Sequence, residues 1–283
     1  MSSVAQCILR GFLVAIVLLA PALMLPGISN DAAQGATLLA LIAAIVVMTE
    51  YSASYPGLIE FRDAKPYNRG RFMLLAAIIF SLIFLQRDLH LNPDASGFLT
   101  AFAISLADTL NFTLSPVTML VTALPEGLGP DHLASVMVSA TLAYVLSLAG
   151  LLVFCFGLIS GYWPNHSAIF NVWVNLPNFD PTKGVDIVHR LERDGQVNFI
   201  LGVIMPFSLP ALLHLSSFLV QPMTLETPLA LVWGIALWAF IPVSLIMRGA
   251  AMYRIAQLIR AQRRRVAEEE AALPLPPQSA YSA

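Results

Sequence analysis

Seven stretches of apolar residues alternate with shorter polar segments along this chain. They cover residues 11–28, 36–50, 72–86, 97–124, 132–160, 199–220 and 228–247. An α-helix needs about 20 mostly apolar residues to cross the hydrocarbon core of a bilayer, so each stretch is a candidate membrane-crossing helix. The third stretch is short, but it is bordered by Arg71 and Arg87, whose long side chains can reach outward from the helix ends.

The overall composition agrees with a membrane environment. Charged residues make up 11% of the chain and hydrophobic residues 58%, whereas a soluble domain has about 25% charged residues. Most of the protein surface must therefore face lipid rather than water. The two cysteines, Cys7 and Cys155, are far apart in the sequence and offer neither a disulfide framework nor a CxxC motif. The sequence predicts an all-α, polytopic bundle of membrane helices.

The distribution of lysine and arginine predicts how the chain is threaded, because these residues are enriched in cytoplasmic loops. Seven crossings with a cytoplasmic N-terminus would put the six basic residues between 248 and 265 outside. Removing one crossing between residues 97 and 160 puts fourteen of the fifteen basic residues inside, and leaves only Arg87 outside. We therefore expect six crossings, with both termini cytoplasmic in a bacterial-type inner membrane.

The stretch at 97–124 is the better candidate for a segment that does not cross. Asp108, Asn111, Ser115 and Pro116 lie near its middle, where a crossing helix should be most apolar, and a re-entrant or interfacial segment can accommodate them. An alternative is an eighth, short crossing within 162–178, although the tryptophans there suit the membrane interface. The first stretch could also be a cleaved secretory signal, but its length favours a retained helix.

Two basic regions are candidate contacts for anionic lipid or for a protein partner. The first is the predicted cytoplasmic loop at 51–71, and the second is a predicted basic amphipathic helix at 248–272. The candidate residues are Arg62, Lys65, Arg69, Arg71, Arg254, Arg260, Arg263, Arg264 and Arg265. Basic clusters next to a membrane segment are attracted to an anionic leaflet. The alternative is that these charges only fix the orientation of the chain.

A polar site inside the membrane is the second candidate feature. A carboxylate within a membrane segment costs several kcal/mol unless it is paired or hydrated, so Asp108 marks a possible functional site. Asn111, three residues later, would share a helix face with it. Pro206 and Pro210 are expected to bend the helix that carries His214, and Tyr144 could donate a hydrogen bond. We expect Asp108 to face protein or trapped water near His214, either for transport or only for helix packing.

Known catalytic and cofactor motifs do not occur in this sequence. It has no HExxH, GxGxxG, Walker A or GxSxG pattern, and His214 is the one histidine deep inside an apolar stretch, which argues against a two-histidine haem site. We expect no catalytic residue, metal ion or cofactor.

The division of the chain follows from the same pattern. A membrane-embedded domain at 1–247 should include the loop at 51–71 and a surface segment at 161–198. The basic helix at 248–272 and a disordered tail at 273–283 should follow it.

These features favour a non-enzymatic accessory, assembly or scaffold protein of a larger membrane complex. The expected partners are the lipid bilayer and other membrane subunits or further copies of the chain, without nucleic acid. The alternative is a small transporter or channel that uses the polar site around Asp108 and His214. An enzyme acting on lipids is a third class, which no pair of nucleophile and base supports.

Overall fold

The computed structural model describes residues 3–62, 65–92, 97–161, 175–177, 186–216 and 224–272, and these contain helices and no strand. The long helices are α1 (Ser3–Met24), α2 (Asn30–Ser52), α3 (Lys65–Leu91), α6 (Pro130–Ile159), α8 (Ile187–Ser216) and α9 (Pro228–Ala272). All six are long and apolar enough to cross a membrane. The predicted all-α, polytopic membrane bundle is therefore confirmed, and the protein is a multi-pass membrane protein.

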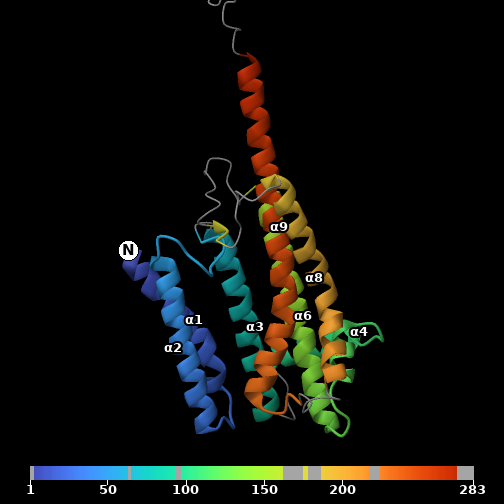
Figure 1. Ribbon diagram of the computed structural model, residues 1–283. Helices are drawn as coiled ribbons and strands as arrows, with labels where there is room; N and C mark the ends of the chain where they lie inside the picture. The colour runs from blue at the N-terminus through green and yellow to red at the C-terminus, as the bar shows by residue number, and fades with distance from the viewer. Residues whose placement is uncertain are drawn as a thin grey trace, which may run out of the picture.

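The six long helices run alternately up and down through the bundle (Figure 1). The start of α1, the connection between α2 and α3, the start of α8 and the end of α9 all lie at one end, which we call the basic end. The opposite end holds the connection from α1 to α2 and the start of α6 (Figure 1). An even number of long helices brings the two ends of the described chain to the same side of the bundle.

The apolar stretch at 97–124 forms two short helices rather than one crossing helix. α4 (Phe98–Leu110) has 13 residues and α5 (Pro116–Thr122) has 7, and each is too short to span a bilayer. Asn111 follows the end of α4, whereas Ser115 precedes α5 and Pro116 is its first residue. Proline is favoured at the first position of a helix because its missing N–H has no partner there. The polar residues therefore mark the break.

Two long helices extend beyond the predicted apolar stretches. α8 begins at Ile187, so residues 187–198, predicted as part of a separate surface segment, are its first turns. α9 runs without interruption from Pro228 to Ala272, and the predicted basic helix at 248–272 is its continuation. The end of α9 projects beyond the rest of the bundle at the basic end (Figure 1). The tail at 273–283 and most of 161–186 lie outside the described residues.

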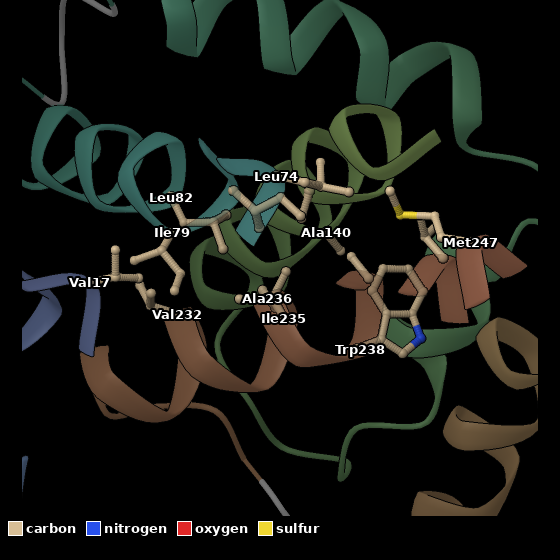
Figure 2. Close-up of a cluster of buried hydrophobic side chains, with 14 of the residues drawn as sticks. Val17, Leu74, Ile79, Leu82, Ala140, Val232, Ile235, Ala236, Trp238 and Met247 are labelled. Carbon is tan, nitrogen blue, oxygen red and sulfur yellow. The ribbon is translucent and has the colours of Figure 1, made fainter. Parts of the chain in front are cut away.

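The hydrophobic core lies where α9 meets α3 and α6. Figure 2 shows this cluster, with Val17 from α1 beside it. Ile79, Leu82, Ala140, Val232, Ile235 and Ala236 are fully buried. Many leucines of α1, α2 and α8 are exposed instead, as expected for helices whose outer faces contact lipid chains.

Small residues bring α8 and α9 into close contact near the basic end. A Cβ atom added at Gly249 would lie 2.7 Å from the carbonyl oxygen of Gly195, which is too close for any side chain. Small residues let membrane helices approach each other closely and pack by van der Waals contact. This contact holds the first turns of α8 against the part of α9 that carries Arg248.

Candidate functional site

A cavity of about 910 Å³ opens at the basic end, between the α1–α2 pair and the helices α3 and α9. It is lined by α1, α2 and α3, by the connection that precedes α3, and by α8 and α9. Its volume lies within the range of small-molecule sites, about 300–1,000 Å³. We call it the arginine pocket.

The arginine pocket is strongly positive. Among the described residues, its lining includes five arginines and one carboxylate, that of Glu60, so these residues give it a formal excess of four positive charges. The arginines are Arg10, Arg62, Arg69, Arg71 and Arg248. Arg62, Arg69 and Arg71 were predicted from the sequence as contacts for anionic lipid, whereas Arg10 and Arg248 were not. Because α1, α3 and α9 are far apart in the sequence, the sequence pattern did not indicate that they line one cavity.

The Glu60 carboxylate is bound by one of the arginines of the pocket. The Nε and Nη2 atoms of Arg248 donate hydrogen bonds to the two carboxylate oxygens of Glu60, at 2.5 and 2.7 Å. The Glu60 side chain is only 14% exposed, so an unpaired charge there would be costly. This bidentate pair attaches the connection before α3 to α9 and neutralises the one carboxylate among the described residues that line the pocket.

The connection between α2 and α3 folds into an ordered unit. The carboxylate of Glu50 accepts hydrogen bonds from the backbone N–H groups of Gly57, Leu58 and Ile59, at 3.0, 2.8 and 3.1 Å. Arg62 donates from Nη1 to the carbonyl oxygens of Glu50 and Ala53. These bonds hold the wall of the pocket in place, and a basic residue predicted as a lipid contact has a structural role here.

Arg71 and Arg10 are both held against aromatic rings. The Arg71 guanidinium lies 5.3 Å from the ring centroid of Tyr67 and donates a hydrogen bond to the Ser244 hydroxyl of α9. The Arg10 guanidinium lies 4.0 Å from the ring centroid of Tyr51 on α2. Stacking on an aromatic ring orients a guanidinium and leaves its edge N–H groups available for other acceptors.

The pocket changes from polar to apolar with depth, and four helices contribute to this gradient. On α1, Arg10 lies nearest the basic end, and Leu13 and Val14 follow it towards the middle of the bundle. The corresponding pairs on the other helices are Tyr51 above Val47 on α2, Arg69 above Phe72 on α3, and Arg248 above Leu245 on α9. A charged rim over an apolar floor matches a ligand with an anionic head and a hydrocarbon tail.

The basic cluster on α9 is largely paired within the protein. Arg260 Nη2 donates to Glu192 of α8 at 2.6 Å, and Arg263 forms an ion pair with Asp186 at 2.7 Å. The hydrogen bond from Arg263 lowers the pKa of the exposed Asp186 carboxyl below its ordinary value. Arg254 donates to Gln257 at 3.5 Å. Arg264 and Arg265 are exposed, so they remain candidates for contact with lipid or a partner. Lys65 begins α3.

The residues proposed for a polar intramembrane site lie on separate elements. Asp108, in the last turn of α4, is exposed. We expected it to face protein or trapped water, and the described part of the chain does not bury it. Asn111 lies beyond the end of α4, and His214 is exposed in the last turns of α8. Tyr144 packs against the Trp238 ring at a centroid distance of 5.7 Å. The pairing of Asp108 with His214 stays a prediction.

Comparisons with protein-family models, with curated proteins and with solved structures return no match to this chain. Within the residues that the structure describes, no three His, Cys, Asp or Glu side chains gather in a group that could hold a metal ion.

Proposed function

We propose that this protein is a non-enzymatic accessory or scaffold protein of a membrane complex that binds an anionic lipid in the arginine pocket. The observation that carries the proposal is the pocket lining, in which the described residues place an excess of four positive charges over an apolar floor. Arginine binds phosphate groups through two parallel N–H donors, which a hydrated lysine does less well. An anionic lipid matches both parts of this surface, with its phosphate at the rim and its chains below.

The accessory role is supported by the end of α9. This helix continues beyond the bundle at the basic end (Figure 1), where its last turns are exposed. Ion pairs to Glu192 of α8 and to Asp186, just before α8, hold this part of α9, so it can present a fixed surface to a second subunit. Extraction in a mild detergent, followed by size-exclusion chromatography, should recover the protein with a stoichiometric partner. Recovery as a homo-oligomer alone would contradict the accessory role.

We also propose that the membrane is a cell inner membrane and that the basic end is cytoplasmic. The support is the asymmetry of charge, since Arg87 is the exception among fifteen basic residues. Arg87 donates to the carbonyl oxygen of Met24 at 2.9 Å, and a cation at a helix C-terminus is stabilised by the free carbonyl groups there. The exception thus has a local structural reason.

Lipid binding is tested by native mass spectrometry of protein released from nanodiscs that contain phosphatidylcholine and phosphatidylglycerol. The wild type should retain phosphatidylglycerol in preference to phosphatidylcholine. The double variant Arg10→Gln/Arg69→Gln removes two charges from the rim and should lose this preference. Arg193→Gln is the matched control, because Arg193 is an exposed arginine at the same end that pairs with Asp194 outside the pocket. Equal retention of both lipids by the wild type would refute the proposal.

A transporter is the second candidate, favoured by the break between α4 and α5 and by the contact of α5 with the proline-containing helix α8. Broken helices beside ionisable groups are common in transport pathways. Asp108→Asn tests this candidate in a proteoliposome flux assay. Loss of flux with an unchanged thermal unfolding temperature would support transport, and unchanged flux would remove Asp108 from the mechanism.

A further inference from the structure

We infer that the arginine pocket selects a lipid whose head is a phosphate monoester, and that Arg10 and Arg69 bind this head from two sides. The inference rests on the proposed lipid binding and specifies the class of ligand.

Three of the five arginines already bind groups of the protein. Arg248 binds Glu60 through two hydrogen bonds, Arg62 binds backbone carbonyl oxygens, and Arg71 binds Ser244. These bonds connect the loop, α3 and α9, so they belong to the walls of the pocket. Arg10 and Arg69 remain, and in the described part of the chain neither pairs with a carboxylate.

Arg10 and Arg69 reach the rim from different helices. Arg10 is on α1 and is oriented by the Tyr51 ring, whereas Arg69 is an exposed residue near the start of α3. Arg10, Tyr51 and Arg69 all line the same cavity, so both guanidinium groups border the arginine pocket. A ligand bound to both would connect the α1–α2 pair to α3.

The chemistry of the rim favours a monoester over a diester. A phosphate monoester has a charge of about −1.5 to −2 at neutral pH and three terminal oxygens, and this allows two guanidinium groups to bind it at once. A diester such as the head of phosphatidylglycerol has one charge and two terminal oxygens. A zwitterionic head would also bring a cation towards the excess positive charge. A dianion with a hydrocarbon tail therefore suits the rim and the floor best.

The test measures the ratio of two lipids rather than total lipid binding. Protein released from phosphatidylcholine nanodiscs that also contain equal amounts of dioleoyl phosphatidic acid and dioleoyl phosphatidylglycerol is analysed by native mass spectrometry. The wild type should retain the monoester over the diester by ~10-fold at neutral pH, which is one unit in the logarithm of affinity. Lowering the pH through the second pKa of the monoester, about 6, should bring the ratio towards one.

Variants connect this ratio to the two residues. Arg10→Gln and Arg69→Gln should each lower the ratio, and Arg10→Lys should lower it less, because lysine keeps the charge but loses the paired donors. Arg193→Gln should leave the ratio unchanged. An unchanged thermal unfolding temperature for each variant shows that the fold is intact. An unchanged ratio in Arg10→Gln and Arg69→Gln would overturn the assignment of these residues.

The outcomes separate the inference from the proposed function. Retention of both anionic lipids at equal levels over phosphatidylcholine would refute monoester selectivity and leave lipid binding standing. Retention of neither would refute both. In a parallel experiment, inorganic phosphate is titrated against bound phosphatidic acid. Displacement of the lipid at equal concentration would show that free phosphate is the ligand and would overturn the lipid assignment.

Discussion

The indole Nε1 of Trp238 donates a hydrogen bond to the carbonyl oxygen of Pro206 at 3.3 Å, inside the bundle. Pro210, four residues after Pro206, has no N–H group and cannot make the helical hydrogen bond to this carbonyl. A neighbouring helix therefore supplies the missing donor. Both prolines remain within α8, which continues to Ser216, and the carbonyl freed by Pro210 has a partner in α9.

Trp238→Phe should destabilise the protein by about 1–3 kcal/mol, the usual cost of leaving a buried acceptor without a partner. Phenylalanine keeps most of the ring that packs against Tyr144, so the lost donor is the main change. The measurement is the thermal unfolding temperature in detergent. Pro210→Ala restores an N–H group at position 210, so Trp238→Phe should cost less in that background. An equal cost in both backgrounds would contradict the explanation.

The bidentate pair of Glu60 with Arg248 should show strong coupling in a double-mutant cycle. Glu60→Gln leaves a partly buried Arg248 without its charge partner and should lower the free energy of unfolding by about 1–3 kcal/mol. This cost is smaller than for a fully buried pair, because solvent partly screens the exposed part of the pair. The double variant Glu60→Gln/Arg248→Gln should recover part of this loss. Additive losses would mean that the two side chains stabilise the protein independently.

The close contact of α8 with α9 predicts that alanine changes the thermal unfolding temperature differently at two helical glycines. Gly249→Ala places a Cβ atom 2.7 Å from the Gly195 carbonyl oxygen, so the helices must separate, at a cost of about 1–3 kcal/mol. Gly157→Ala is the control, since no atom lies within 4 Å of its added Cβ, and alanine is the better helix former by about 1 kcal/mol. Thermal unfolding should therefore fall for the first variant and hold or rise for the second. A rise for Gly249→Ala would contradict the close contact.

The sequence was sufficient to predict the helical class and the break in the stretch at 97–124, because both depend on local properties. Apolar length sets which segments can cross, and Ser115 with Pro116 marks where a helix starts. The pocket was not predictable in the same way. Arg10 and Arg248 are 238 positions apart, and only the packing of α1 and α9 around α3 brings them to one cavity. The pairing of Arg260 with Glu192 was missed for the same reason.

The sidedness of the basic end gives the last prediction. Basic residues are retained on the cytoplasmic side during membrane insertion, and the six long helices bring the start of α8 and the end of α9 to the same end of the bundle (Figure 1). Single cysteines at positions 190 and 280, in a background without Cys7 and Cys155, should both be protected from an impermeant thiol reagent in intact cells. Both should react once the membrane is permeabilised. A cysteine at position 29, in the connection between α1 and α2 at the opposite end, should react in intact cells and so shows that the reagent works. Labelling of position 190 from outside, with position 280 protected, would mean that the two positions lie on opposite sides and would refute the six-crossing arrangement.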